Sequence, residues 1–125
     1  MTENEIRSAT VAEIVVTYEK KVKENGLEIM NGNADAANAA YDVVWLCSKE
    51  LKRRGVDSQE ALLPLLGSDD PQVRLCAAKD ALDFAPALGV VELENLARSN
   101  VIWRLDAQMI FREWQREKLK FSGGK

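Results

Sequence analysis

The amino-acid sequence predicts an all-α protein, and three observations lead to this prediction. Apolar residues recur at spacings of three and four through most of the chain, and residues typical of helix starts and ends separate these segments. No segment alternates apolar and polar residues over the length of a strand. The length of 125 residues, 46% of them hydrophobic and 30% charged, is that of one soluble domain. We therefore expect a single helical domain over residues 1–125, with flexible ends at about 1–8 and 121–125.

The first two predicted helices are the longest pair in the chain. The first is expected to begin at Thr10, which forms a capping-box pattern with Glu13, and to end at Gly32. Asn33 is expected to cap the second helix, which covers residues 34–54 and stops at a glycine. The apolar row of the first helix, at helical spacing, is Val11, Ile14, Val15, Tyr18, Val22 and Ile29.

Four further helices are predicted in the second half of the chain. Asp70 is expected to cap one of them and Pro71 to take its first position, where a missing N–H loses no partner. The expected bounds are about 58–67, 70–84, 86–98 and 100–120. An apolar stripe in the last of these helices is expected to be core, and it consists of Trp103, Ala107, Ile110, Phe111 and Trp114.

Short connections predict how the helices are arranged. Helices joined by a few residues pack as antiparallel hairpins. Six helices in three hairpins form a short right-handed α–α superhelix of the HEAT/armadillo type, whose usual purpose is to offer a binding surface. The middle hairpin has the signature of such a repeat: a Leu-rich segment at 61–67, then Asp-Pro-Gln-Val-Arg at 70–74 and paired alanines. Arg74 is expected to tie its helix to the preceding turn or to the next repeat.

These residues also resemble a small uncharacterised bacterial family with an α–α superhelix fold. The resemblance rests on Leu62–Leu66, Asp70–Ala78, Leu82, Ala85-Pro86 and Glu50–Gly55. It covers about residues 10–98 and does not include the last helix. It implies a fold, brings no catalytic motif, and points towards immunity proteins, because family members look like neighbours of bacterial polymorphic toxins.

The composition argues against most catalytic chemistry. The chain has no histidine, so Ser/His/Asp and Cys/His nucleophile systems cannot be built, and no glycine-rich phosphate loop occurs. Cys47 and Cys76 are separated widely and have no histidine partner, which argues against structural zinc and predicts packed thiols. The pair Asp69-Asp70 is expected to cap a helix rather than act as an acid. We expect no enzyme, no catalytic residue, no metal and no cofactor.

Charge and hydropathy limit the partners. The net charge of −3 disfavours nucleic acid, although residues 98–125 hold seven Lys/Arg against three Asp/Glu. The N-terminus is polar, so we expect no signal peptide, and no apolar run in the sequence is long enough to span a membrane. We therefore expect a cytoplasmic protein without membrane contact.

The best functional clue is in the second helix, where Trp45 falls inside a polar stripe. A ring at this position is either buried by a neighbouring helix or exposed for a partner, and the sequence leaves both possibilities open. The stripe and a few positions of the fourth predicted helix are the expected partner-binding residues: Asp35, Asn38, Asp42, Trp45, Lys49, Arg53, Gln72, Lys79 and Asp83.

These features favour a non-catalytic protein–protein interaction domain. The concrete form of this hypothesis is an immunity-type inhibitor that binds and blocks a bacterial toxin domain. The negative net charge of this chain suits a basic partner. The alternative is a nucleic-acid-binding HEAT-like module, and an enzyme is the weakest of the three hypotheses.

Overall fold

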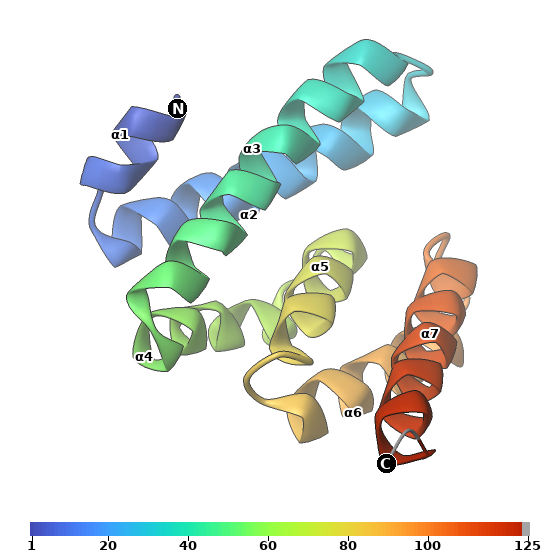
Figure 1. The fold of residues 1–125 in the computed structure, drawn as a ribbon. Helices are drawn as coiled ribbons and strands as arrows, with labels where there is room; N and C mark the ends of the chain where they lie inside the picture. The colour runs from blue at the N-terminus through green and yellow to red at the C-terminus, as the bar shows by residue number, and fades with distance from the viewer. Residues whose placement is uncertain (124–125) are drawn as a thin grey trace.

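The computed structural model describes the backbone of residues 1–123 and the side chains of residues 1–118, and every regular element in it is helical (Figure 1). The elements are α1 (Glu3–Ser8), α2 (Val11–Met30), α3 (Ala34–Arg54), α4 (Val56–Gln59), the 3₁₀ helix η1 (Glu60–Gly67), α5 (Pro71–Ala81), α6 (Pro86–Ala97) and α7 (Arg104–Gly123). The predicted all-α fold is confirmed. Within residues 1–123, no helix is long and apolar enough to cross a membrane.

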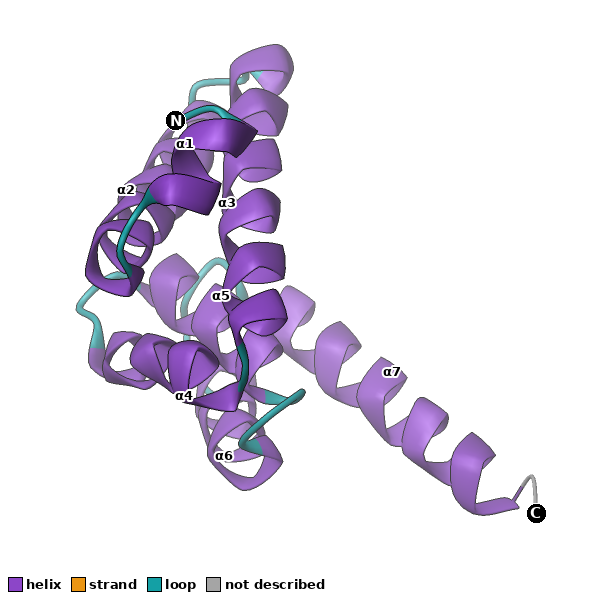
Figure 2. Cartoon of the chain, turned by 60° about the vertical axis from the view of Figure 1, so that its left-hand side comes forward, coloured by secondary structure: helices purple, strands orange, loops and turns teal. Residues whose placement is uncertain are grey.

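Three hairpins follow one another along the chain, as predicted. The packed pairs are α2 with α3, η1 with α5, and α6 with α7, and α5 also contacts both α2 and α6 (Figure 1). The second half of α7 extends beyond the other helices (Figure 2). The helix α5 therefore joins the N-terminal and C-terminal hairpins.

Local sequence signals set the helix starts. The Thr10 hydroxyl accepts a hydrogen bond from the backbone N–H of Glu13, whose side chain bonds back to Thr10, so the capping box is confirmed. Asn33 and Asp70 accept hydrogen bonds from the first turns of α3 and α5, at 3.2 and 2.8 Å. Gly55 ends α3 at φ 112°, a backbone conformation that favours glycine.

The first eight residues differ from the expectation. They were expected to be a flexible end, but Glu3–Ser8 forms the helix α1 and its Ile6 side chain is only 1% exposed. A capping box between Thr2 and Glu5 starts this helix, and Ile6 joins the core beneath α3. A single buried residue produces no apolar periodicity, which is why the pattern did not predict a helix.

Two other boundaries also differ. The predicted third helix is split into α4 and η1, because Pro64 has no N–H and clashes with an α-helical turn. Turns occupy residues 99–103, so the last helix begins at Arg104 rather than near residue 100. Its helical backbone continues to Gly123, so the predicted tail is helical at 121–123, whereas 124–125 lie outside the described residues.

The core has two parts that meet at α5. The larger cluster joins α1, α2, α3, η1 and α5 around Tyr18, Leu51 and Val73. The smaller cluster lies between α5, α6 and α7 and includes Leu93 and Ala107. Because α5 contributes to both clusters, displacing it disturbs the whole stack.

Polar contacts fasten α5 to its neighbours. Arg74 donates hydrogen bonds to the carbonyl oxygen of Ser68 at 2.6 Å and to a Glu92 carboxylate oxygen at 3.2 Å. Ser68 lies in the preceding turn and Glu92 in the following hairpin, so the structural role predicted for Arg74 is confirmed. The Tyr18 hydroxyl of α2 donates to the Asp80 carboxylate at 2.6 Å.

Candidate protein-interaction surfaces

Trp45 lies on the surface of α3, with 55% of its area exposed. The possibility that a neighbouring helix buries the ring is therefore excluded. The Nζ atom of Lys49, one turn further along, lies 4.9 Å from the ring centre in a cation–π contact. The other predicted stripe residues on α3 are also exposed: Asp35, Asn38, Asp42 and Arg53. We call these six residues the α3 stripe, and their contact with a partner stays a prediction.

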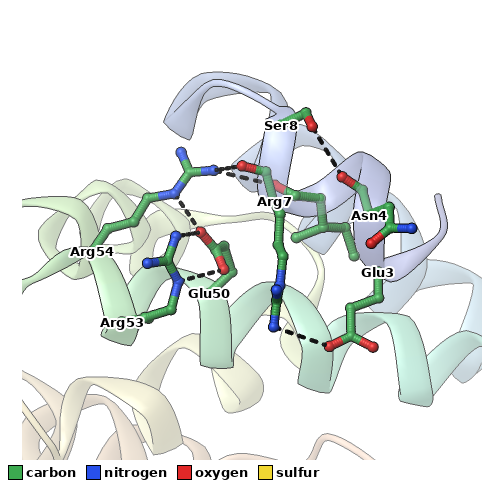
Figure 3. A network of polar contacts seen from close by, with 8 residues as sticks. Glu3, Asn4, Arg7, Ser8, Glu50, Arg53 and Arg54 are labelled. Carbon is green, nitrogen blue, oxygen red and sulfur yellow. Dashed lines mark hydrogen bonds and ion pairs between the residues drawn. The ribbon is translucent and has the colours of Figure 1, made fainter.

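A charged clamp holds the C-terminal end of α3 against α1 (Figure 3). The buried Glu50 carboxylate accepts hydrogen bonds from Arg53 at 2.6 Å and from Arg54 at 2.7 Å. Arg54 also donates to the carbonyl oxygens of Ile6 and Arg7 at the end of α1. The hydrogen bonds from Arg53 and Arg54 lower the pKa of Glu50 to about 2.

Glu50→Gln is expected to lower the free energy of unfolding by about 1 kcal/mol near neutral pH, because a neutral acceptor replaces a charged one. The pKa of Glu50 is lower in the folded chain than its ordinary 4.5. Its stabilisation is therefore full above pH 4.5 and is lost as the pH falls towards 2. Urea unfolding of both proteins should show that the difference between their free energies of unfolding becomes smaller as the pH falls through this range. A difference that does not change with pH would contradict the lowered pKa of Glu50.

On α5, the structure separates Gln72 from the other predicted contact residues. Gln72 is only 6% exposed, and its amide donates to the Asn25 side chain at 2.6 Å. The oxygen of its side-chain amide lies 1.8 Å from where a Cβ on Gly26 would be, so a larger residue at position 26 would displace the Gln72 side chain. Gln72 therefore does not lie on the open surface beside the α3 stripe, because the end of α2 covers the start of α5, and its contact with a partner stays a prediction.

Lys79 and Asp83 are exposed and lie beside α3, as expected. Lys79 donates to the Tyr41 hydroxyl at 2.6 Å, and Asp83 pairs with Lys52 at 3.4 Å. The structure thus places Lys79 of α5 and Asp83 of the turn after it next to the α3 helix, and each is already bonded within the chain.

A groove that the sequence analysis missed lies between the end of α2, the face of α5 and the start of α7. It consists of two hollows, of about 250 and 380 Å³, that are both lined by the half-buried Trp103. Five of the twelve large apolar side chains exposed in the described chain line it: Leu27, Ile29, Met30, Ile102 and Met109.

Polar groups on the groove floor are already bonded. Gln72 and Asn25 bond to each other, and Lys79 bonds to Tyr41. Cys76 also lines the groove, and burial raises the pKa of its thiol to about 12, so it is not a thiolate at neutral pH. Cys47 is fully buried, as predicted, whereas Cys76 is partly exposed. The groove therefore offers apolar contact rather than reactive groups.

Of the two acidic positions before α5, Asp70 has a structural role. Asp70 caps α5 through the backbone N–H of Gln72, as predicted.

Among the residues that the structure describes, no group of three or more His, Cys, Asp or Glu side chains is arranged to hold a metal ion. No buried side-chain nitrogen or oxygen atom there is without a hydrogen-bond partner.

Comparisons with known proteins place the chain in a family. Residues 12–114 match the family described as "Domain of unknown function (DUF2019)". The crystal structure of the protein RPA1889 from Rhodopseudomonas palustris CGA009 is similar, with a TM-score of 0.85 and 28% sequence identity over 89% of this chain and 93% of that chain. No curated protein matches the sequence significantly.

The family match corrects one expectation from the sequence. The resemblance was expected to end near residue 98, but the match continues into α7 as far as Trp114. It thus includes Trp103 and Met109 on the wall of the groove. By this match over most of its length, the chain belongs to the DUF2019 family of helical proteins.

Proposed function

We propose that this protein is a non-catalytic protein-binding module, and concretely an immunity-type inhibitor that blocks a bacterial toxin domain. The observation that carries the proposal is the groove, which five exposed apolar side chains line together with Trp103. Contiguous exposed apolar surface that is rimmed by polar residues is typical of protein-binding sites in soluble proteins.

The groove has the properties of an anchor site. Trp103 is a half-buried aromatic residue that lines both hollows, and methionine and isoleucine side chains line them with it. Aromatic residues and methionine are enriched at the centres of interfaces, and methionine adapts to the shape of a partner. An apolar side chain of a partner that enters this groove would leave water without breaking a bonded polar pair on the floor.

Charges outside the groove suit a basic partner. Asp35 and Asp42 are exposed on the neighbouring helix α3, and the whole chain has a net charge of −3. Such charges speed the encounter with a basic protein more than they strengthen the final complex. A basic toxin domain is therefore the partner class that we propose.

The test is to co-express the tagged chain with the product of the adjacent gene and to isolate the complex. We expect a stoichiometric complex of the two proteins and protection of the host from the toxicity of the second one. Absence of a complex, or steeply salt-dependent binding of RNA by the chain alone, would contradict the proposal and favour the nucleic-acid alternative.

A further inference from the structure

The charges of the α3 stripe are separated along the helix. Acidic Asp35 and Asp42 lie before Trp45, and basic Lys49 and Arg53 lie after it. All of them are exposed, and Asp42 and Lys49 form no ion pair with any other described residue. Asp42 and Lys49 are seven residues apart, about two helical turns, so they project from the same side of α3.

Because the acidic residues lie before Trp45 and the basic residues after it, the stripe of one copy is complementary in charge to the stripe of a second copy that runs antiparallel to it. If two copies of α3 pair antiparallel about a two-fold axis beside Trp45, Asp42 of each copy lies opposite Lys49 of the other. The same register places Asn38 opposite Arg53. A parallel pairing would instead bring like charges together.

We propose that the α3 stripe binds the α3 stripe of a second copy of this chain, with the two Trp45 rings meeting at the two-fold axis. The interface is isologous, so each favourable contact occurs twice. Two Asp42–Lys49 pairs form on either side of the rings. The rings lose exposed apolar area that nothing in the single chain covers.

The geometry of the single chain already suits this arrangement. The Lys49 Nζ atom lies 4.9 Å from the centre of the Trp45 ring, so the cation and the ring belong to one continuous part of the surface that the second copy would cover. None of the α3 stripe residues lines the groove. The α3 stripe and the groove therefore share no residue, and the inference does not rest on the proposed function.

The size of the surface predicts a weak dimer. One face of a 21-residue helix buries less area than the roughly 1,200 Å² at the lower limit of stable interfaces. We expect a monomer–dimer equilibrium with a dissociation constant of about 10 µM to 1 mM. Sedimentation velocity over a concentration series in this range measures it directly.

Two single charge reversals test the register. Asp42→Lys and Lys49→Asp should each be monomeric at concentrations where the unaltered chain dimerises, because each places like charges across the axis. Mixed in equal amounts, the two variants should form a heterodimer, since one copy then presents two basic residues and the other two acidic ones. The double variant Asp42→Lys/Lys49→Asp should dimerise like the unaltered chain.

Circular dichroism and thermal melts of each variant show whether it is folded, and all the altered positions are exposed. Asp57→Lys, another exposed acidic position outside the stripe, is the matched control and should dimerise normally. A chain that is monomeric throughout the range would overturn the inference. A dimer that tolerates both single reversals, or reversals whose mixture stays monomeric, would overturn it equally.

Discussion

Asp80→Ala is expected to lower the free energy of unfolding by about 2–3 kcal/mol, because it leaves a buried hydroxyl without an acceptor. Tyr18 is fully buried, and its hydroxyl donates to Asp80 at 2.6 Å. The contact joins α2 to α5, the helix shared by both core clusters. Chemical denaturation of the variant and the unaltered chain at neutral pH measures the loss.

Two further variants separate the hydrogen bond from other effects. Asp80→Asn should lose much less stability, because its amide oxygen still accepts from Tyr18. Burial raises the pKa of Asp80, so the neutral amide also removes a penalty on the charged form. In the Tyr18→Phe background, Asp80→Ala should be much milder. Equal losses in both backgrounds would show that the hydroxyl pairing is not the cause.

Gly89→Ala is expected to lower the free energy of unfolding by about 1–3 kcal/mol through overpacking. A Cβ on Gly89 would lie 2.7 Å from the carbonyl oxygen of Ala78 and 3.2 Å from the backbone nitrogen of Leu82. Both are backbone atoms near the end of α5, so α6 must move away from α5 to relieve the contact. Alanine normally stabilises a helix relative to glycine by about 1 kcal/mol, so a net loss identifies the clash.

Gly67→Ala is the matched control for this prediction. A Cβ on Gly67 would meet nothing within 4 Å, so the change should be neutral or slightly stabilising. Thermal melts of the two variants and of the unaltered chain measure the difference in stability. A Gly89→Ala protein as stable as the control would mean that α5 and α6 do not approach each other as closely as described.

Local signals account for the parts of the fold that the sequence predicted. The caps at Thr10, Asn33 and Asp70 act within one turn of the residue, so their consequences can be read without knowing the tertiary structure. The same kind of signal, between Thr2 and Glu5, was present before α1. It was missed because one buried isoleucine does not make a periodic pattern.

Which residues lie on the surface depends on how the helical hairpins pack against one another. The local sequence pattern does not contain this information. Gln72 and Lys79 are seven residues apart and share a face of α5, yet one is buried by α2 and the other is exposed. Trp45 is exposed, and the side chains that connect α3 with α5 and with the turn after α5 are Tyr41 and Lys52 instead. Only the placement of α7 opposite the end of α2 makes Ile29 and Met109 walls of one groove.

The affinity of the groove for its protein partner is the most direct test of the proposed function. Isothermal titration should compare the unaltered chain with Met109→Glu, which places a charge in the groove, and with Leu88→Glu. Leu88 is an equally exposed apolar residue on α6 that does not line the groove. Binding through the groove predicts that Met109→Glu weakens the complex by about 30-fold or more while Leu88→Glu binds normally. Equal affinities for all three proteins would contradict it.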